Sequence, residues 1–406
     1  MTQALQKKVI NYLGPFLISI SIILLSYDHV AWVQFWGKLN IPATIPPFSD
    51  LNALNIFLSY KQDGLNPYIE SSQGHSVHKV LMYPSIWLSI TELLNLQNQI
   101  NFIFFSFFIL YLYFYILLDL AFKINDKKFL FILTLFFFST SNFLLIERLN
   151  VELIIFCIVY FGLISSKLGS QILFFLLSIV LKLFPIFSIF VFINRIRYFF
   201  LIMILCLFYI IFMRHEIFII LNNSIEYALI FAYGIGSIAK GFYYYSTKFG
   251  YFINDDNYFF FKNSLILITT IYAISIFLIN FKFKKNEIKT EISIEEKLYL
   301  SGAGIYIGTY ITSANIDYRL CFLIFTIPFL INQKNFKMIN VYLLLMIICF
   351  NSLIFEGGNT YSFFYLFKAS IIYFFKFIIF TVNCYYFGLI LNKFINFNFL
   401  KLKKSN

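Results

Sequence analysis

The feature that most constrains this chain is a series of apolar blocks, each about as long as a lipid bilayer is thick. A transmembrane helix needs about 20 apolar residues, each rising about 1.5 Å. Because the hydrocarbon core offers the backbone no hydrogen-bond partners, such blocks fold as helices or as strands of a closed barrel. They lack the alternation of barrel strands. The sequence therefore predicts an all-α, polytopic integral membrane protein.

The composition leads to the same class. Of 406 residues, 60% are hydrophobic and 12% are charged, whereas about a quarter of the residues in a soluble domain are charged. The net charge of +12 comes from cations that cluster beside apolar blocks, as the positive-inside rule describes, so we predict no nucleic-acid partner. We expect a multi-pass protein of the cell membrane, surrounded by membrane lipids.

The distribution of cations also gives a topology. With the N-terminus inside, beside Lys7 and Lys8, the polar segments 28–79 and 214–262 become long extracytoplasmic loops. We predict about 10–12 transmembrane helices in a single domain, 1–406. The predicted spans are 13–27, 99–122, 129–146, 151–165, 198–213, 263–281, 298–314, 320–333, 338–354 and 370–392, together with the block 170–193.

The block 170–193 has cations at both ends, near Lys167 and Arg195, and a single span cannot place both ends inside. Pro185 breaks the helix, and Lys182 is costly within an apolar block. We therefore expect two short antiparallel helices with Lys182 near their outer tip, and the exact number of spans stays open here. Before the second span, residues 80–97 predict an amphipathic helix in the membrane interface, part of the long first loop.

This topology collects unusual polar side chains on the outer face, whereas transporters place such groups near the midplane. The arrangement suits a reaction on a lipid-anchored substrate. If the substrate is a sugar on a polyprenyl phosphate, the leaving phosphate needs cations, and the acceptor hydroxyl needs a carboxylate as general base. The residues gathered there are Asp50, Asp63, Glu147, Arg148, Asn150, Lys182, Asp317 and Arg319.

Several short segments resemble those of GT-C glycosyltransferases, particularly glycosyltransferase family 87. The resemblance covers roughly residues 10 to 330. One departure is Leu149, which stands where the family pattern has Gly. The segments are Phe48-Ser49-Asp50-Leu51, Asp63-Gly64-Leu65-Asn66-Pro67-Tyr68, Tyr83-Pro84, Glu147-Arg148-Leu149-Asn150-Val151-Glu152, Lys182-Leu183-Phe184-Pro185, and Tyr318-Arg319 followed by Pro328.

The resemblance implies a GT-C fold, a polyprenyl-phosphate-sugar donor and an inverting hexosyltransferase acting on the extracytoplasmic face. Mannose is the candidate hexose, a lipid-linked or glycan molecule the acceptor, and the bacterial inner membrane the expected location. The implied roles are catalysis for Asp50, donor-phosphate binding for Lys182, Arg319 and Arg148, and substrate binding for Asp63, Tyr68, Glu147 and Asn150.

Each of these residues also has a structural alternative. Asp50 can cap a helix, Lys182 can reach the interface, and Arg319 can pair with Asp317. Asp63 and Asn150 suit turns, and Glu147 and Arg148 can form a local ion pair. We expect no cofactor and no metal site at His75 and His78. A divalent cation held between two acidic side chains and a substrate phosphate stays an alternative. The alternative functions are a transporter or flippase of lipid-linked saccharides and an O-antigen-type polysaccharide polymerase.

Overall fold

The computed structural model describes residues 3–69, 80–223, 231–248, 255–283, 292–312, 314–333, 338–356 and 363–404. It divides into two compact units, the first made of Met1–Leu130, Phe143–Leu183 and Leu205–Ile225, the second of the remainder. The expectation of a single domain stays a prediction.

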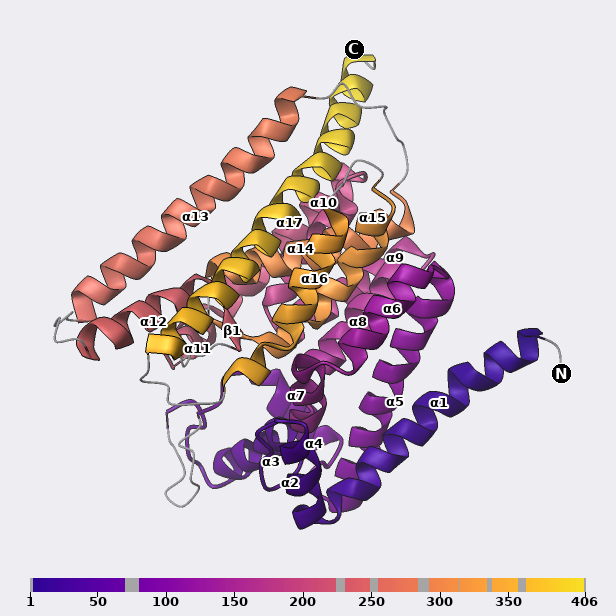
Figure 1. Ribbon diagram of the computed structural model, residues 1–406, viewed down its shortest axis with the longest axis vertical. Helices are drawn as coiled ribbons and strands as arrows, with labels where there is room; N and C mark the ends of the chain where they lie inside the picture. Colours follow the sequence, from indigo (N-terminus) through magenta and orange to yellow (C-terminus); the bar gives the residue numbers. More distant parts are fainter. Residues whose placement is uncertain are drawn as a thin grey trace. The chain divides into compact units, whose positions relative to one another are not determined.

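The regular elements described in the first unit are all helices. In it α1 packs on α5, α5 on α8, and α8 on α9, as Figure 1 shows for the indigo and purple helices. The helices are α1 (Gln3–Ser26), α2 (His29–Lys38), α3 (Ser49–Gln62), α4 (Ile86–Leu93), α5 (Gln99–Ile124), α8 (Glu152–Ile164), α9 (Leu168–Leu181) and α11 (Arg214–Asn223), with parts of α6 (Lys127–Phe137), α7 (Thr140–Arg148) and α10 (Ile196–Phe212).

The second unit is built around α14, against which the 3₁₀ segments η1 and η2 and the helix α17 all pack. A two-residue ribbon, β1 with β2, pairs Ala232 with Ile316 in antiparallel register. Its elements are η1 (Phe184–Phe192), β1 (Ala232–Tyr233), α12 (Ile235–Lys248), α13 (Asp255–Phe283), α14 (Ile294–Thr312), β2 (Asn315–Ile316), η2 (Asp317–Thr326), α15 (Ile327–Ile331), α16 (Ile339–Phe350), η3 (Ser352–Glu356) and α17 (Phe363–Lys404).

Glycines on α14 explain how the 3₁₀ segments approach so closely. A Cβ atom added at Gly304 would lie 2.1 Å from the carbonyl oxygen of Phe187 in η1, and one at Gly302 would lie 2.4 Å from that of Phe322 in η2. Small residues allow this backbone approach between membrane-embedded segments.

Among the described residues, three helices are long and apolar enough to cross a membrane, namely α5, α13 and α17, or up to six if each sharply bent pair is one span. Three shorter apolar helices, α8, α9 and α16, accompany them. In the apolar window of α13, 17% is buried within the protein, so most of its apolar side chains lie on the surface. The all-α architecture and these helices indicate a membrane protein, with fewer qualifying spans than the 10–12 predicted.

The lower number arises because several apolar blocks are broken. The block 129–146 divides into α6 and α7, bent by 54°, and α10 bends by 73° into α11. The block 170–193 breaks at Lys182, as predicted, but its second half is the 3₁₀ segment η1 and not an α-helix. The predicted span 370–392 includes Lys376, a buried charge that the sequence analysis did not single out.

The first loop contains more helix than the sequence analysis predicted. Within 28–79 lie α2, capped by Asp28, and α3. The predicted interfacial helix at 80–97 is the shorter α4, which buries Trp87, Leu88 and Thr91 and leaves Leu93 exposed.

Candidate functional site

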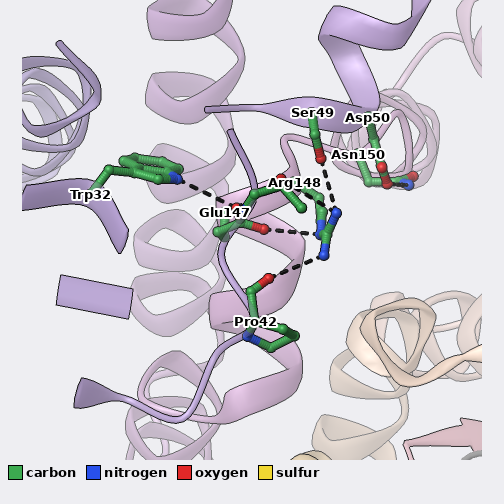
Figure 2. A network of polar contacts seen from close by, with 8 residues as sticks. Trp32, Pro42, Ser49, Asp50, Glu147, Arg148 and Asn150 are labelled. Atoms are coloured by element: carbon green, nitrogen blue, oxygen red, sulfur yellow. Dashed lines mark hydrogen bonds and ion pairs between the residues drawn. The ribbon is translucent and has the colours of Figure 1, made fainter. Parts of the chain in front are cut away.

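Asp50 lies in the first turn of α3, half-buried, and its carboxylate accepts a hydrogen bond from the side-chain amide of Asn150 at 2.6 Å (Figure 2). The N-cap of α3 is Phe48, in a left-handed conformation without a side-chain cap. The capping alternative for Asp50 is therefore wrong. The carboxylate at the start of the helix has the favourable sign for the helix dipole.

The turn between α7 and α8 fixes the orientation of Asn150. The amide nitrogen of Leu149 donates to the carbonyl of Ile146, and that of Asn150 donates to the carbonyl of Leu145, the pattern of a Schellman motif. Asn150 Oδ1 then accepts from the backbone nitrogen of Glu152 at 3.0 Å. Because the oxygen is used at the start of α8, the amide nitrogen is directed to Asp50.

Glu147 and Arg148 form the predicted local ion pair, with Arg148 Nε 2.9 Å from Glu147 Oε2. Glu147 is fully buried and also accepts from the backbone nitrogen of Thr44 at 2.8 Å. Arg148 donates to Ser49 Oγ at 3.0 Å and to the carbonyl of Pro42 at 3.1 Å. Figure 2 shows this guanidinium directed at both oxygens. The pair therefore holds the first loop at the point where α3 begins.

Lys182 faces a carboxylate that the sequence analysis did not assign to it. Its ammonium lies 2.7 Å from Glu152 Oε2, and the two side chains are 15% and 0% exposed. The ammonium is also 4.8 Å from the ring centre of Tyr83. Asn150 Nδ2 in turn lies 3.3 Å from the Tyr83 hydroxyl. The structure thus brings Asp50, Asn150 and Lys182 together around Tyr83.

Tyr68 belongs to a neighbouring cluster in the same unit. Its hydroxyl donates to Glu216 Oε1 of α11 at 2.6 Å, and Glu216 Oε2 accepts from Ser85 Oγ at 3.0 Å. The backbone nitrogen of Ser85 also donates to Glu216 Oε1. Burial and then the bond to Glu216 raise the pKa of Tyr68 well above its ordinary value, so the phenol stays protonated and donates.

Arg319 lies in the second unit, in η2. It donates to Asn315 Oδ1, and its guanidinium is 4.6 Å from the ring centre of Phe184. Asp317 forms a fully buried ion pair with Lys376 of α17 at 2.7 Å. Ser352 Oγ also donates to Asp317.

Asp63 is exposed at the C-cap of α3. His75 and His78 lie outside the described residues. Within the part of the chain that the structure describes, no group of three or more His, Cys, Asp or Glu residues is placed to hold a metal ion. All five cysteines are free and buried.

Sequence reasoning missed three polar partners. Glu152 was read as part of a motif and not as the partner of Lys182, and Glu216 and Lys376 were not considered at all. Glu152 and Lys376 had a usable signal, because each is a charge inside an apolar block and such charges are usually paired. Glu216 lies in a polar segment and gave no comparable signal.

A scan against protein-family models finds no match for the chain, and searches of curated proteins and of solved structures find none either. The fold and the site define a class of protein: a helical membrane protein in which buried polar side chains contact the first loop.

Proposed function

We propose that the protein is a membrane glycosyltransferase of GT-C type. It transfers a hexose, with mannose the first candidate, from a polyprenyl phosphate to a lipid-linked or other extracytoplasmic acceptor. The observation that carries the proposal is the position of Asp50, a half-buried carboxylate held by Asn150 beside Tyr83 and Lys182.

The chemistry assigns a role to each group. Asp50 takes the proton of the acceptor hydroxyl, which then attacks the anomeric carbon while the bond to the phosphate oxygen breaks, with inversion. The leaving phosphate takes the bond electrons and is stabilised by Lys182. Arg148 contacts Ser49, Thr44, Pro42 and Glu147, so it positions α3. Arg319 remains a proposed donor contact.

The first test is sugar transfer in membranes containing the protein, with labelled polyprenyl-phosphate hexoses and added acceptor lipids. Asp50→Asn keeps the size of the side chain and removes the base, so transfer should fall at least about a hundredfold, the scale of general base catalysis. Glu92→Gln is the control, since Glu92 is an exposed carboxylate of α4 with no assigned role. Transfer by Asp50→Asn at the wild-type rate would rule out Asp50 as the general base.

A second test separates phosphate binding by Lys182 from its structural role. Lys182→Met removes the ammonium facing buried Glu152 and should cost about 3–5 kcal/mol of stability. Lys182→Met with Glu152→Gln should regain most of that stability, because no buried carboxylate then faces an apolar chain. Thermal unfolding and transfer are measured together. Regained stability without regained transfer supports phosphate binding, whereas parallel recovery of both assigns Lys182 a structural role only.

A transporter or flippase is the second candidate, because charges inside spans favour transport. The observation that favours it is Lys376, fully buried within the candidate span Phe364–Phe394. Vesicles containing the protein and a fluorescent polyprenyl-phosphate sugar test this function. Translocation without glycosyl transfer would favour it over the enzyme.

A further inference from the structure

Glu216 of α11 is joined by hydrogen bonds to two separate parts of the first loop. One carboxylate oxygen accepts from the Tyr68 hydroxyl at 2.6 Å and from the backbone nitrogen of Ser85, and the other accepts from Ser85 Oγ at 3.0 Å. The Tyr68 hydroxyl is also 3.0 Å from the carbonyl oxygen of Tyr83. The carboxylate therefore holds Ser85, at one end of the Tyr83-Pro84-Ser85 turn, and Tyr68, whose hydroxyl lies beside the carbonyl at the other end.

That turn carries Tyr83, whose side chain contacts both Asn150 and Lys182 of the candidate site. The Tyr83 hydroxyl lies 3.3 Å from Asn150 Nδ2, and its ring lies 4.8 Å from the Lys182 ammonium. A shift of the turn would move both contacts at once. Small displacements of positioning groups can cost about a hundredfold in rate.

A sharp bend in the chain before α11 brings Glu216 to the first loop. The chain bends by 73° after α10, and α11 begins at Arg214. The bend brings a carboxylate from a part of the sequence more than a hundred residues away, since Glu216 and Ser85 are 131 positions apart. The hydrogen bonds of Glu216 are to Tyr68 and Ser85 and not to Asp50, Asn150 or Lys182.

We propose that Glu216 is a positioning residue that fixes the Tyr83 turn and, through it, the geometry of the site around Asp50. The catalytic part of this inference rests on the proposed function. Glu216 acts through hydrogen bonds at fixed positions and does not contact the reacting atoms. Its negative charge is therefore not needed, which distinguishes it from a second catalytic base.

Two substitutions separate these roles. Glu216→Gln keeps an acceptor toward Tyr68 and the Ser85 nitrogen, and its amide can donate to Ser85 Oγ, whose hydroxyl rotates to accept. Glu216→Ala removes all three contacts. The matched control is His215→Ala, which changes the adjacent exposed residue of the same helix. Tyr68→Phe removes one donor with little change of shape.

The first measurement is hydrogen–deuterium exchange of full-length protein in lipid nanodiscs, read on peptides covering 81–90. In Glu216→Ala the Ser85 amide should exchange about tenfold faster, as expected for loss of one buried hydrogen bond. Glu216→Gln and His215→Ala should stay within about threefold of wild type. Adding Tyr68→Phe to Glu216→Ala should raise exchange further, because the Tyr68 hydroxyl can still donate to the Tyr83 carbonyl when Glu216 is absent. Unchanged Ser85 exchange in Glu216→Ala would overturn the inference.

The second measurement is transfer from a labelled polyprenyl-phosphate hexose. Glu216→Ala should lower kcat/KM about 10- to 100-fold, with Glu216→Gln within about threefold of wild type. Equal losses in both variants would overturn the positioning role, because charge would then be required. A wild type that transfers no sugar would overturn the proposed function, and the exchange measurement alone would then decide whether Glu216 fixes the turn.

Discussion

At the residue scale, the structure explains how Leu149 is accommodated where the resemblance to glycosyltransferases predicts Gly. Leu149 has φ +44°, a left-handed conformation, at the C′ position of the motif that ends α7. Gly is usual there because it lacks a Cβ. Leu149 is nevertheless 1% exposed, so burial of its side chain compensates for the unfavourable backbone. The backbone of the turn is that of a Gly site although the residue is Leu.

The stabilities of Leu149→Gly and Leu149→Ala should therefore show the reverse of the order usual within a helix. Both lose the buried side chain, at about 2–5 kcal/mol, but only Gly also relieves the left-handed conformation, by about 1 kcal/mol. The Gly variant should be the more stable of the two in thermal unfolding. Leu145, buried in the same helix, is the control: there Gly should be less stable than Ala. The same order at both positions would contradict the strain argument.

At the element scale, the second unit depends on how closely two 3₁₀ segments approach α14. Such segments have poorer hydrogen-bond geometry than α-helices, and here both η1 and η2 are stabilised by packing on the same glycine-bearing helix. The small residues Gly302-Ala303-Gly304 indicate in the sequence that another segment can approach α14 closely. Periodicity alone does not identify which segments do so. Both segments were therefore predicted as α-helices.

Gly304→Ala should destabilise the protein by about 1–3 kcal/mol, because the new methyl group would overlap the Phe187 carbonyl. Gly241→Ala is the control, since Gly241 is also helical but a Cβ there meets nothing within 4 Å. That substitution should raise stability by about 0.5–1 kcal/mol. Thermal unfolding in detergent compares the two. A neutral Gly304→Ala would show that η1 can move away from α14.

At the scale of the whole molecule, the first-loop contacts constrain topology. Gln97 Nε2 donates to Gln62 Oε1 at 3.1 Å, so the end of α3 lies beside the residues that precede α5, and Tyr68 is bonded to Glu216. The sequence analysis placed segments 28–79 and 214–262 on one side by charge alone. Within the first unit, the Tyr68–Glu216 bond brings the beginning of the second segment beside the first segment, whereas the side of the remainder stays a prediction. Which side faces the cytoplasm stays a prediction from the cations.

Cysteine labelling tests this arrangement, because all five native cysteines are buried and should stay unlabelled in folded protein. Asp63→Cys and His215→Cys should react with an impermeant maleimide from the same side of sealed vesicles. Lys128→Cys, exposed just beyond the C-terminal end of α5, should react only from the opposite side. Labelling of Asp63→Cys and Lys128→Cys from one side would mean that α5 does not cross the membrane.

The sequence by itself determined the helical membrane class, most helix positions and the break at Lys182, because apolar length, charge and proline act locally. It also singled out Asp50, Asn150 and Lys182. Only the tertiary structure decided their partners. Ion pairs and hydrogen bonds such as Lys182 with Glu152, or Tyr68 with Glu216, join segments 30 and 148 positions apart. No local pattern encodes such distances, because they depend on how the helices pack.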